Sequence, residues 1–326
     1  MLVHRPRRLR RTAAIRNLIR ETNLSRHDFV LPLFVSEKIE RAKAIPSMPG
    51  VHQYSGKEIA AIAQHAHESG VQAVLLFGIP KSKDEQASGA YAKDGVVQNA
   101  VQQMKERTPD LTVITDVCLC EYTSHGHCGV TRLDGEHFHV LNDESVALIA
   151  KTAVSHAAAG ADMVAPSDMM DGRIGAVRAA LDQAGFDQTG IMSYAAKFAS
   201  VFYGPFRDAA ESPPQFGDRR SYQMDPANAD EALREVELDL AEGADIVLVK
   251  PALPYLDILW RVRQRFGRPT AVYYVSGEFA MVKAAAEKGL VDERAAVLEI
   301  MTSLKRAGAD FIVSYWALDL MEWLKS

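Results

Sequence analysis

The three cysteines are the residues of this chain whose types and spacing most clearly point to chemistry. They share one stretch of eleven residues: Cys118, Cys120 and Cys128. The stretch directly follows the apolar, β-branched run 111–117, which predicts a buried strand. Thiolates suit Zn²⁺, and three protein ligands leave the fourth tetrahedral position open, as catalytic zinc sites do. His125 and His127 are candidates for that position, and reduced cysteines without a metal are the alternative.

Two lysines form a second reactive pair, because Lys197 and Lys250 each lie at the end of a predicted strand between apolar or small residues. A buried ammonium either pairs with an acid or loses its proton. Lowering a lysine pKa from about 10.4 to near 7.5 needs roughly 4 kcal/mol, which burial and an adjacent cation can supply. The neutral amine attacks carbonyl groups, so the pair predicts a Schiff-base enzyme acting on ketones or aldehydes. Salt bridges to Asp168, Asp171 or Glu278 are the alternative.

A long connection between the fifth predicted strand and the next helix, residues 198–225, is expected to form a lid or binding loop. It carries groups suited to planar recognition of carboxylates: Arg207, Arg219, Arg220 and Gln223. A solvated charged loop is the alternative. A keto acid would satisfy both parts of such a site, with its carbonyl at the lysine and its carboxylate at the lid.

The elements that must position these groups follow a βα rhythm. Eight short β-branched runs alternate with helical segments, at 29–35, 73–77, 112–117, 162–165, 190–193, 245–249, 270–275 and 310–314. Gly-Ala-Asp recurs before three of them, where a glycine cap ends a helix. The pattern predicts an α/β fold, a single (β/α)8 TIM barrel, whose active site lies at the carboxyl ends of the strands.

Length and composition limit the classes of protein to which the chain can belong. The chain has 326 residues, of which 48% are hydrophobic and 24% charged, typical of a globular protein. We expect an N-terminal arm at 1–28 and a catalytic barrel at 29–326, with the lid at about 198–225. No apolar run has the roughly 20 residues that a membrane span needs, so the cytoplasm is the expected location. The net charge of −5 argues against nucleic-acid binding, despite the arginines between Arg5 and Arg11.

Several motifs extend the interpretation to a family. They are DVCLCEYTSHGHCG at 116–129, APSDMMDGR at 165–173, MSYAAKFAS at 192–200, GPFR at 204–207, YQMDP at 222–226, VKP at 249–251, VSGEFA at 275–280 and SY at 314–315. Together they resemble the porphobilinogen synthases, also called 5-aminolevulinate dehydratases, over nearly the whole chain. The resemblance implies a lyase that condenses two 5-aminolevulinate molecules into porphobilinogen with loss of two waters, on the route to haem and other tetrapyrroles.

The resemblance also implies roles for the lysines and the metal ligands. Lys250 resembles the lysine that forms a Schiff base with the substrate supplying the propionate side, and Lys197 the one that engages the acetate-side substrate. The cysteine triad resembles the catalytic Zn²⁺ site of the zinc-dependent branch, since magnesium-dependent members have aspartates there. Glu235 falls where some members bind an allosteric Mg²⁺, although a surface glutamate is the simpler interpretation.

The remaining roles concern substrate and assembly. The lid residues matching the acetate-side carboxylate site are Arg207, Arg219 and Gln223. The hydroxyls matching the propionate-side site are Ser276 and Tyr315. The residues expected to line the mouth and move protons or orient the amine are Asp116 and Ser167. Resemblance further implies that the arm wraps a neighbouring barrel in a homo-octamer, with hexamers as an alternative state.

Other readings remain open at the level of the sequence. A Schiff-base aldolase on the same barrel would need one lysine and no metal. A non-catalytic zinc-binding scaffold would keep the barrel without imine chemistry, and a nucleic-acid protein would use the basic stretch from Arg5 to Arg11.

Overall fold

A computed structural model describes residues 2–134 and 137–325. Within them, eight parallel strands close into a barrel, in the order β12-β11-β10-β9-β8-β5-β4-β1, and β12 pairs with β1. The barrel strands are β1 (Phe29–Ser36), β4 (Ala73–Ile79), β5 (Thr112–Val117), β8 (Met163–Pro166), β9 (Gly190–Lys197), β10 (Ile246–Lys250), β11 (Thr270–Tyr274) and β12 (Phe311–Ser314). The predicted TIM barrel is confirmed.

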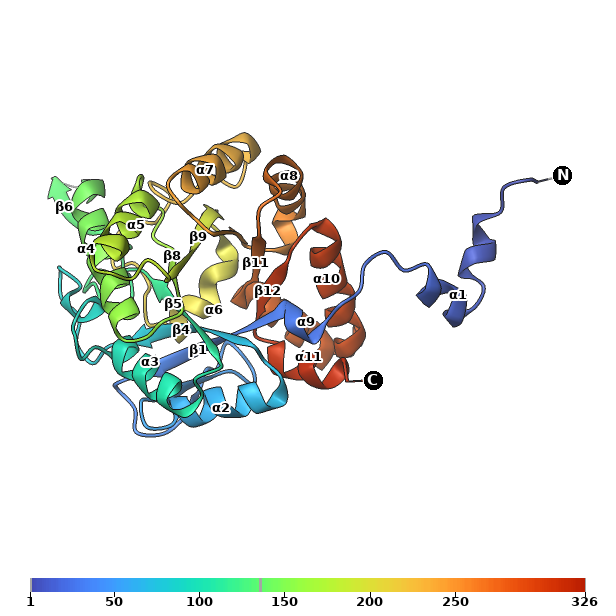
Figure 1. The fold of residues 1–326 in the computed structure, drawn as a ribbon, viewed down its shortest axis with the longest axis horizontal. Coiled ribbons are helices and arrows are strands. Elements are labelled where there is room, and N and C mark those ends of the chain that lie inside the picture. The colour runs from blue at the N-terminus through green and yellow to red at the C-terminus, as the bar shows by residue number, and fades with distance from the viewer. Residues whose placement is uncertain (1, 135–136, 326) are drawn as a thin grey trace.

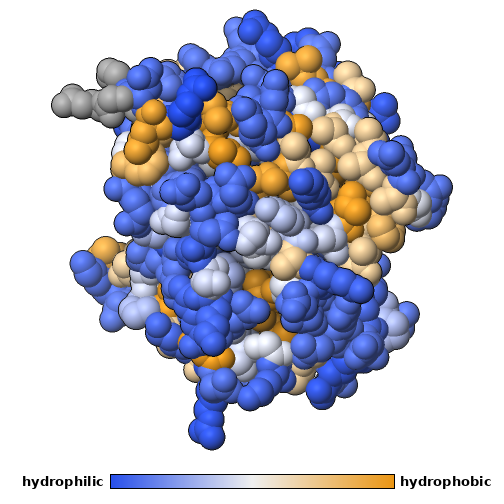
Figure 2. Space-filling view, turned by 90° about the vertical axis from the view of Figure 1, so that its left-hand side faces the viewer, coloured by the Kyte–Doolittle hydropathy of each residue, from blue (hydrophilic) through white to orange (hydrophobic). Residues whose placement is uncertain are grey.

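Helices surround this barrel (Figure 1). They are α2 (Ile59–Ser69), α3 (Val96–Arg107), α4 (Asn142–Ala158), α5 (Arg173–Gln183), α6 (Gly204–Ala209), α7 (Ala229–Ala241), α8 (Leu256–Phe266), α9 (Ser276–Glu287), α10 (Glu293–Ala307) and α11 (Ala317–Trp323). Two short strands, β2 (Lys43–Ala44) and β3 (His52–Ser55), extend the sheet beside β1. The hairpin β6 (Val130–Asp134) and β7 (His137–Leu141) stands apart, on a face that is largely hydrophilic (Figure 2).

The recurrent Gly-Ala-Asp joint has a clear physical role. Gly160, Gly243 and Gly308 adopt left-handed φ angles of 104°, 109° and 117° after their helices, a conformation that glycine adopts without strain. Two residues later, the aspartate carboxylate accepts a backbone N–H from the neighbouring strand, as Asp245 does from Ile191 at 2.7 Å. The equivalent bonds join Asp162 to Val113 and Asp310 to Thr270. Each joint therefore ends a helix and fixes the entry of the next strand.

The strand predicted at 112–117 coincides with β5, and the other observed strands differ from the predicted ones by one or two residues at their ends, except for β9. The sequence predicts a strand over 190–193, but β9 continues to Lys197. The extra residues are rich in alanine, which does not favour strands, yet they are buried and Lys197 pairs with Lys250 of β10. Tertiary pairing therefore overrides local propensity there, and Lys197 belongs to the barrel wall itself.

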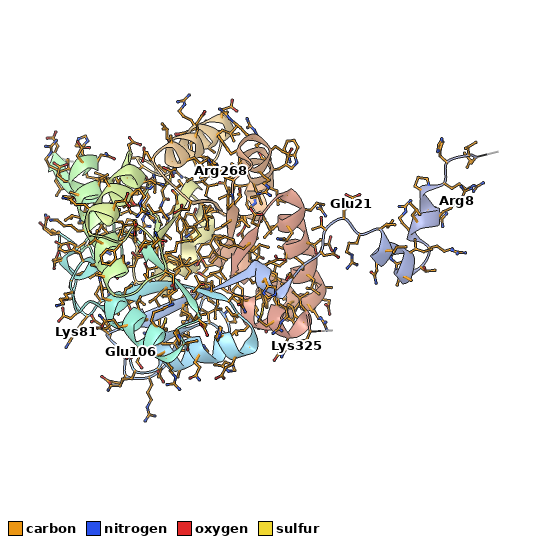
Figure 3. The ribbon with its side chains drawn as sticks, viewed as in Figure 1. Arg8, Glu21, Lys81, Glu106, Arg268 and Lys325 are labelled. Atoms are coloured by element: carbon orange, nitrogen blue, oxygen red, sulfur yellow. The ribbon has the colours of Figure 1, made fainter. Side chains whose placement is uncertain are left out.

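The segment before β1 extends away from the barrel (Figures 1 and 3). It contains the 3₁₀ helix η1 (Pro6–Arg10), helix α1 (Ala13–Leu18) and the 3₁₀ helix η2 (Arg26–Asp28). Several of its apolar side chains are exposed, among them Leu18 to 85% and Val3 to 77%, whereas Leu24 packs against the core. Among the described residues, no helix combines the length and the apolar character needed to cross a membrane.

Candidate active site

The carboxyl ends of the strands converge on one cavity. Its lining comprises Phe77, Asp116, Cys120, Glu121, Ser167, Lys197, Tyr203, Phe206, Arg207, Arg219 and Lys250. Strand register explains the convergence, because Asp116 of β5 pairs with Ala165 of β8, and Lys197 of β9 pairs with Lys250 of β10. The four residues predicted to act in catalysis thus reach the same space.

Lys250 lies in an aromatic enclosure. Its Nζ atom is within 4.4–5.2 Å of the ring centroids of Tyr194, Tyr203, Phe206 and Tyr273. Only 5% of the residue is exposed. Burial, together with the positive charge of Lys197, lowers the pKa of Lys250 to about 7. A substantial fraction of this amine is therefore neutral near pH 7, as a nucleophile requires.

Lys197 is equally buried but electrostatically different. Its Nζ atom donates a hydrogen bond to the Ser167 carbonyl and lies 5.6 Å from the Tyr194 ring centroid. Burial acts to lower the pKa of Lys197, but the negative charges of Cys128, Cys118 and Asp116 outweigh it and raise the pKa above the ordinary value. The depressed pKa predicted for buried lysines thus holds for Lys250 and not for Lys197.

Of the carboxylates that the sequence offered as salt-bridge partners, those of Asp168 and Glu278 are engaged elsewhere, and Asp171 is exposed. Asp168 is buried beside Arg173, at 3.9 Å, and Asp171 hydrogen-bonds Asn142 through its backbone. Glu278 accepts backbone N–H groups, including that of Val275 at 2.6 Å. Within the described ranges, neither Lys197 nor Lys250 forms an ion pair with a carboxylate.

The three cysteines form a compact cluster. Their sulfur atoms lie within 4.8 Å of one another, with 3.4 Å between Cys118 and Cys120, and all three side chains are buried. Zn–S bonds of about 2.3 Å in tetrahedral geometry place sulfurs about 3.8 Å apart, so the donor set and its spacing fit a metal such as zinc. Hydrogen bonds from Cys118 and Cys120 lower the pKa of Cys128 well below its ordinary value.

Neither histidine of the loop belongs to this cluster among the described residues. The His127 ring nitrogens instead lie 3.1 Å from the Tyr222 hydroxyl and 2.9 Å from the Phe216 carbonyl. His125 Nδ1 accepts the His127 backbone N–H at 3.2 Å, and burial lowers the pKa of His125 to about 4. The structure therefore gives the fourth ligand position to neither ring.

The lid contributes polar groups that lack protein partners. Gln223 is 2% exposed, and neither atom of its amide is hydrogen-bonded. The Nε atoms of Arg207 and Arg219 are also buried without a partner, whereas Arg219 donates from its terminal nitrogen to the carbonyls of Gly126 and Ser212. Arg220 is exposed and lies outside the cavity. Arg207 and Arg219 line the cavity, whereas Gln223 lines a neighbouring groove together with Arg220. Buried polar atoms without partners are rare, so Arg207, Arg219 and Gln223 each have the capacity to bind a polar ligand.

The hydroxyl groups predicted to bind the other carboxylate lie near Lys250. Ser276 Oγ accepts the Phe206 backbone N–H at 2.9 Å, and the Tyr315 and Tyr273 hydroxyls are 3.0 Å apart. Phe206 and Tyr273 are two of the rings that enclose Lys250. The hydroxyl pair thus belongs to the lysine's own surroundings.

Asp116 and Ser167 form a hydrogen-bonded pair that lines the cavity. Ser167 Oγ donates to Asp116 Oδ2 at 3.1 Å, while Asp116 Oδ1 is buried without a partner. Burial, reinforced by the nearby Glu121 carboxylate, raises the pKa of Asp116 to about 7. This carboxyl group can therefore bind or release a proton near neutral pH.

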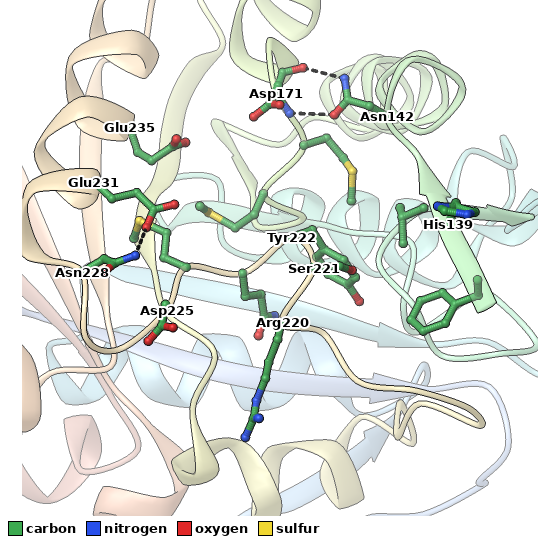
Figure 4. A pocket seen from close by; sticks show the side chains of 16 residues that line it. His139, Asn142, Asp171, Arg220, Ser221, Tyr222, Asp225, Asn228, Glu231 and Glu235 are labelled. Carbon is green, nitrogen blue, oxygen red and sulfur yellow. Dashed lines mark hydrogen bonds between the residues drawn. The ribbon is translucent and has the colours of Figure 1, made fainter. Parts of the chain in front are cut away.

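Glu235 lies outside the cavity, on α7. It lines a separate groove with Glu231, Asp171 and Asn228, and residues 220–225 of the predicted lid line the same groove (Figure 4). Burial raises the pKa of Glu235. The structure keeps this residue apart from the lysines and the cysteines.

Comparison with known proteins gives the same picture. The family model described as delta-aminolevulinic acid dehydratase matches residues 3–323. The chain belongs to this family. It is 55% identical over 321 residues to the delta-aminolevulinic acid dehydratase of Synechococcus elongatus, covering 98% of both chains. Identity to the enzyme of Methanothermobacter thermautotrophicus is 57% over 320 residues, covering 97% of this chain and 96% of that one.

A solved structure extends the comparison to three dimensions. The delta-aminolevulinic acid dehydratase (porphobilinogen synthase) of Toxoplasma gondii ME49, in complex with the reaction product porphobilinogen, aligns with a TM-score of 0.95. Identity is 44%, and the alignment covers 99% of this chain and 92% of that chain. The family assignment makes the chain a lyase, a delta-aminolevulinic acid dehydratase, which confirms the predicted enzyme class.

Three further residues of the site were not selected from the sequence. Tyr194 and Tyr273 contact Lys250 from within β9 and β11, and Glu121 lines the cavity beside Cys120. The aromatic residues lie in apolar strands, where a tyrosine looks like ordinary core. The available signal is that both strands flanking β10, which carries Lys250, contain a tyrosine: Tyr194 in β9 and Tyr273 in β11.

Proposed function

We propose that this dehydratase condenses two molecules of 5-aminolevulinate into porphobilinogen with loss of two waters, through lysine Schiff bases and a zinc site, in tetrapyrrole biosynthesis. The observation that carries the proposal is the pairing of Lys250, with its pKa lowered to about 7, and Lys197 at the same register position of adjacent strands, beside three clustered thiols. The product-bound relative from Toxoplasma gondii supports the same reaction.

Lys250 acts first in this mechanism. Its neutral amine attacks the ketone of the propionate-side substrate, the C=O oxygen leaves as water, and a C=N bond to the lysine forms. The aromatic enclosure excludes bulk water from the amine. The hydroxyls of Ser276 and Tyr315 orient the carboxylate of this substrate.

Lys197 engages the second substrate, on the acetate side. It loses its proton during the reaction, and the Asp116 and Ser167 pair is placed to carry that proton, since both residues line the cavity with it. Arg207, Arg219 and Gln223 hold the acetate-side carboxylate, which satisfies the polar atoms that lack partners.

The metal site completes the proposal. Cys118, Cys120 and Cys128 would hold a zinc ion, since the donor set and spacing fit it. When bound, zinc supplies Lewis-acid chemistry that polarises a coordinated oxygen or nitrogen. We assign Glu235 to an allosteric Mg²⁺ site on the carboxylate-lined groove, where hard oxygen ligands suit that ion.

The proposed assembly is also inferred from the family. We propose that residues 1–28 form an arm that wraps a neighbouring barrel in a homo-octamer, while residues 29–326 form the catalytic barrel with its lid at about 198–225. The exposed apolar side chains of the arm support this, because such groups gain stability when covered by a partner. The cytoplasmic location stays a prediction from the sequence.

The experiment that tests the function is pyrrole formation from 5-aminolevulinate by the purified protein, with and without a zinc-selective chelator. We expect product that disappears on chelation and returns with Zn²⁺. Product that persists without zinc would retain the synthase and remove the metal role. Absence of product, combined with a borohydride-trapped adduct of another ketone at one lysine, would favour an aldolase.

A further inference from the structure

The loop that carries Cys128 and the lid segment 212–223 are in direct contact. The Gln215 backbone N–H donates to the His125 carbonyl at 3.0 Å, and Arg219 donates to the Gly126 carbonyl at 2.9 Å. Gly126 has a φ of +72°, and a Cβ atom placed on it would lie 2.4 Å from the Pro213 carbonyl oxygen. The lid therefore packs on the cysteine loop so closely that one contact requires a glycine.

His127 is at the centre of this contact and uses both ring nitrogens. The Phe216 carbonyl, 2.9 Å from Nε2, can only accept a hydrogen bond, so Nε2 carries the proton. Nδ1 of the neutral ring then accepts from the Tyr222 hydroxyl at 3.1 Å. The ring is fully buried, with its centroid 4.6 Å from that of Phe138 and 4.9 Å from that of Phe216. In this arrangement the imidazole has no free lone pair for a metal.

Tyr222 continues the connection to the cysteines. Once its hydroxyl donates to His127, its oxygen accepts the Cys128 backbone N–H at 3.3 Å. The tyrosine ring also packs against the buried cluster of the three cysteines and Met170. A single side chain of the lid thus orients the backbone of one thiol residue and covers the sulfur atoms.

We propose that His127 and Tyr222 are a positioning pair that makes metal binding at the cysteines and closure of the lid depend on each other. The inference rests on the zinc site proposed above. Neighbouring groups that orient metal ligands typically change metal affinity or activity about 10- to 100-fold when removed. Coupling of this kind is reciprocal, so a closed lid strengthens metal binding as much as metal strengthens closure.

The first test uses the full-length variant Tyr222→Phe, which removes only the hydroxyl. Zinc affinity is measured by competition with a chromophoric chelator, first for the wild type. We expect the variant to bind zinc about tenfold more weakly. At saturating zinc, KM for 5-aminolevulinate should rise more than kcat falls, because the lid binds a substrate carboxylate.

A matched control is Tyr274→Phe. That tyrosine also loses a buried hydrogen bond, its hydroxyl donating to the Glu278 carbonyl at 2.8 Å, but it lies outside the contact between lid and cysteine loop. Its thermal stability should fall while its zinc affinity stays at the wild-type value. Equal zinc affinities in wild type and Tyr222→Phe would overturn the inference, and a wild type that binds no zinc would remove the proposed metal site along with it.

The second test separates positioning from ligation at His127. His127→Gln keeps a donor and an acceptor, whereas His127→Leu keeps neither, so we expect the glutamine variant to retain more zinc affinity. X-ray absorption at the zinc edge of the wild type should show three sulfur neighbours and no imidazole scattering. Imidazole scattering that vanishes in His127→Gln would make the residue a ligand and refute its positioning role.

Discussion

The two halves of the active site place the same residue type in opposite environments. Lys250 is enclosed by aromatic rings, and the hydroxyls beside it are already hydrogen-bonded within the protein. Lys197 faces thiols and lies with lid groups whose polar atoms lack partners. Each of the two residues is 5% exposed, so burial alone does not decide their behaviour.

The difference teaches how one site can distinguish two identical substrates. The pKa of Lys250 is lowered to about 7, while that of Lys197 is raised by its negative neighbours. In the proposed mechanism the amine that is neutral at lower pH reacts first, so we expect Lys250 to form its imine before Lys197 does.

Removing the Lys250 amine should have the largest effect. Lys250→Met should reduce kcat/KM by at least about a thousandfold, because no imine can form with the first substrate. Pyrrole formation measures it. Lys57→Met, at a side chain 80% exposed, is the control and should keep wild-type activity. Near-normal turnover by Lys250→Met would show that Lys250 is not the nucleophile.

The thiol side is tested by Cys120→Ala. Loss of one of three ligands should weaken zinc binding by about 100-fold or more, and activity should fall with zinc occupancy. Metal content and pyrrole formation are measured on the same samples. Met170→Leu changes a neighbour that packs against the cysteines and should retain zinc. Full activity of Cys120→Ala at zero zinc would make the triad structural only.

The pH dependence of imine formation tests the electrostatic difference between Lys250 and Lys197. Lys250 reacts as the neutral amine, so the rate of borohydride trapping at Lys250 with 5-aminolevulinate should rise with pH through about 7 and then level off. In Lys197→Met the nearby positive charge is gone, so the pKa of Lys250 should rise and the midpoint should move to higher pH. Mass spectrometry of the trapped adduct gives the midpoint. An unchanged midpoint would mean that the two lysines do not interact.

The smallest effect is expected at Gln223. Gln223→Leu removes an amide that has no partner in the protein, so thermal stability should be unchanged or slightly higher. KM for 5-aminolevulinate should rise about fivefold, since one hydrogen bond to the acetate-side carboxylate is lost. A stability loss with an unchanged KM would assign Gln223 to the core of the lid and not to substrate binding.

Much of the architecture could be predicted from local pattern. The eight barrel strands were predictable because β-branched residues and flanking turn signals mark them in the sequence. The joint between a helix and the next strand was predictable as well, because Gly243 ends the helix and Asp245 binds the neighbouring strand. The end of β9 was not predictable, because Ala195 and Ala196 adopt strand geometry only through pairing with β10. The lysines and cysteines could be chosen from residue type and position, since few residue types perform imine or thiolate chemistry.

What the sequence by itself determined is the set of reactive groups and the barrel that gathers them, because residue chemistry and the βα rhythm are local properties. Only the tertiary structure decided the state of each group. The opposite pKa shifts of Lys197 and Lys250 arise from burial and from charged groups on other segments. The hydrogen bonds of His127 come from residues about 90 positions away in the sequence. Electrostatic energies depend on distance and burial in space, which no local pattern specifies.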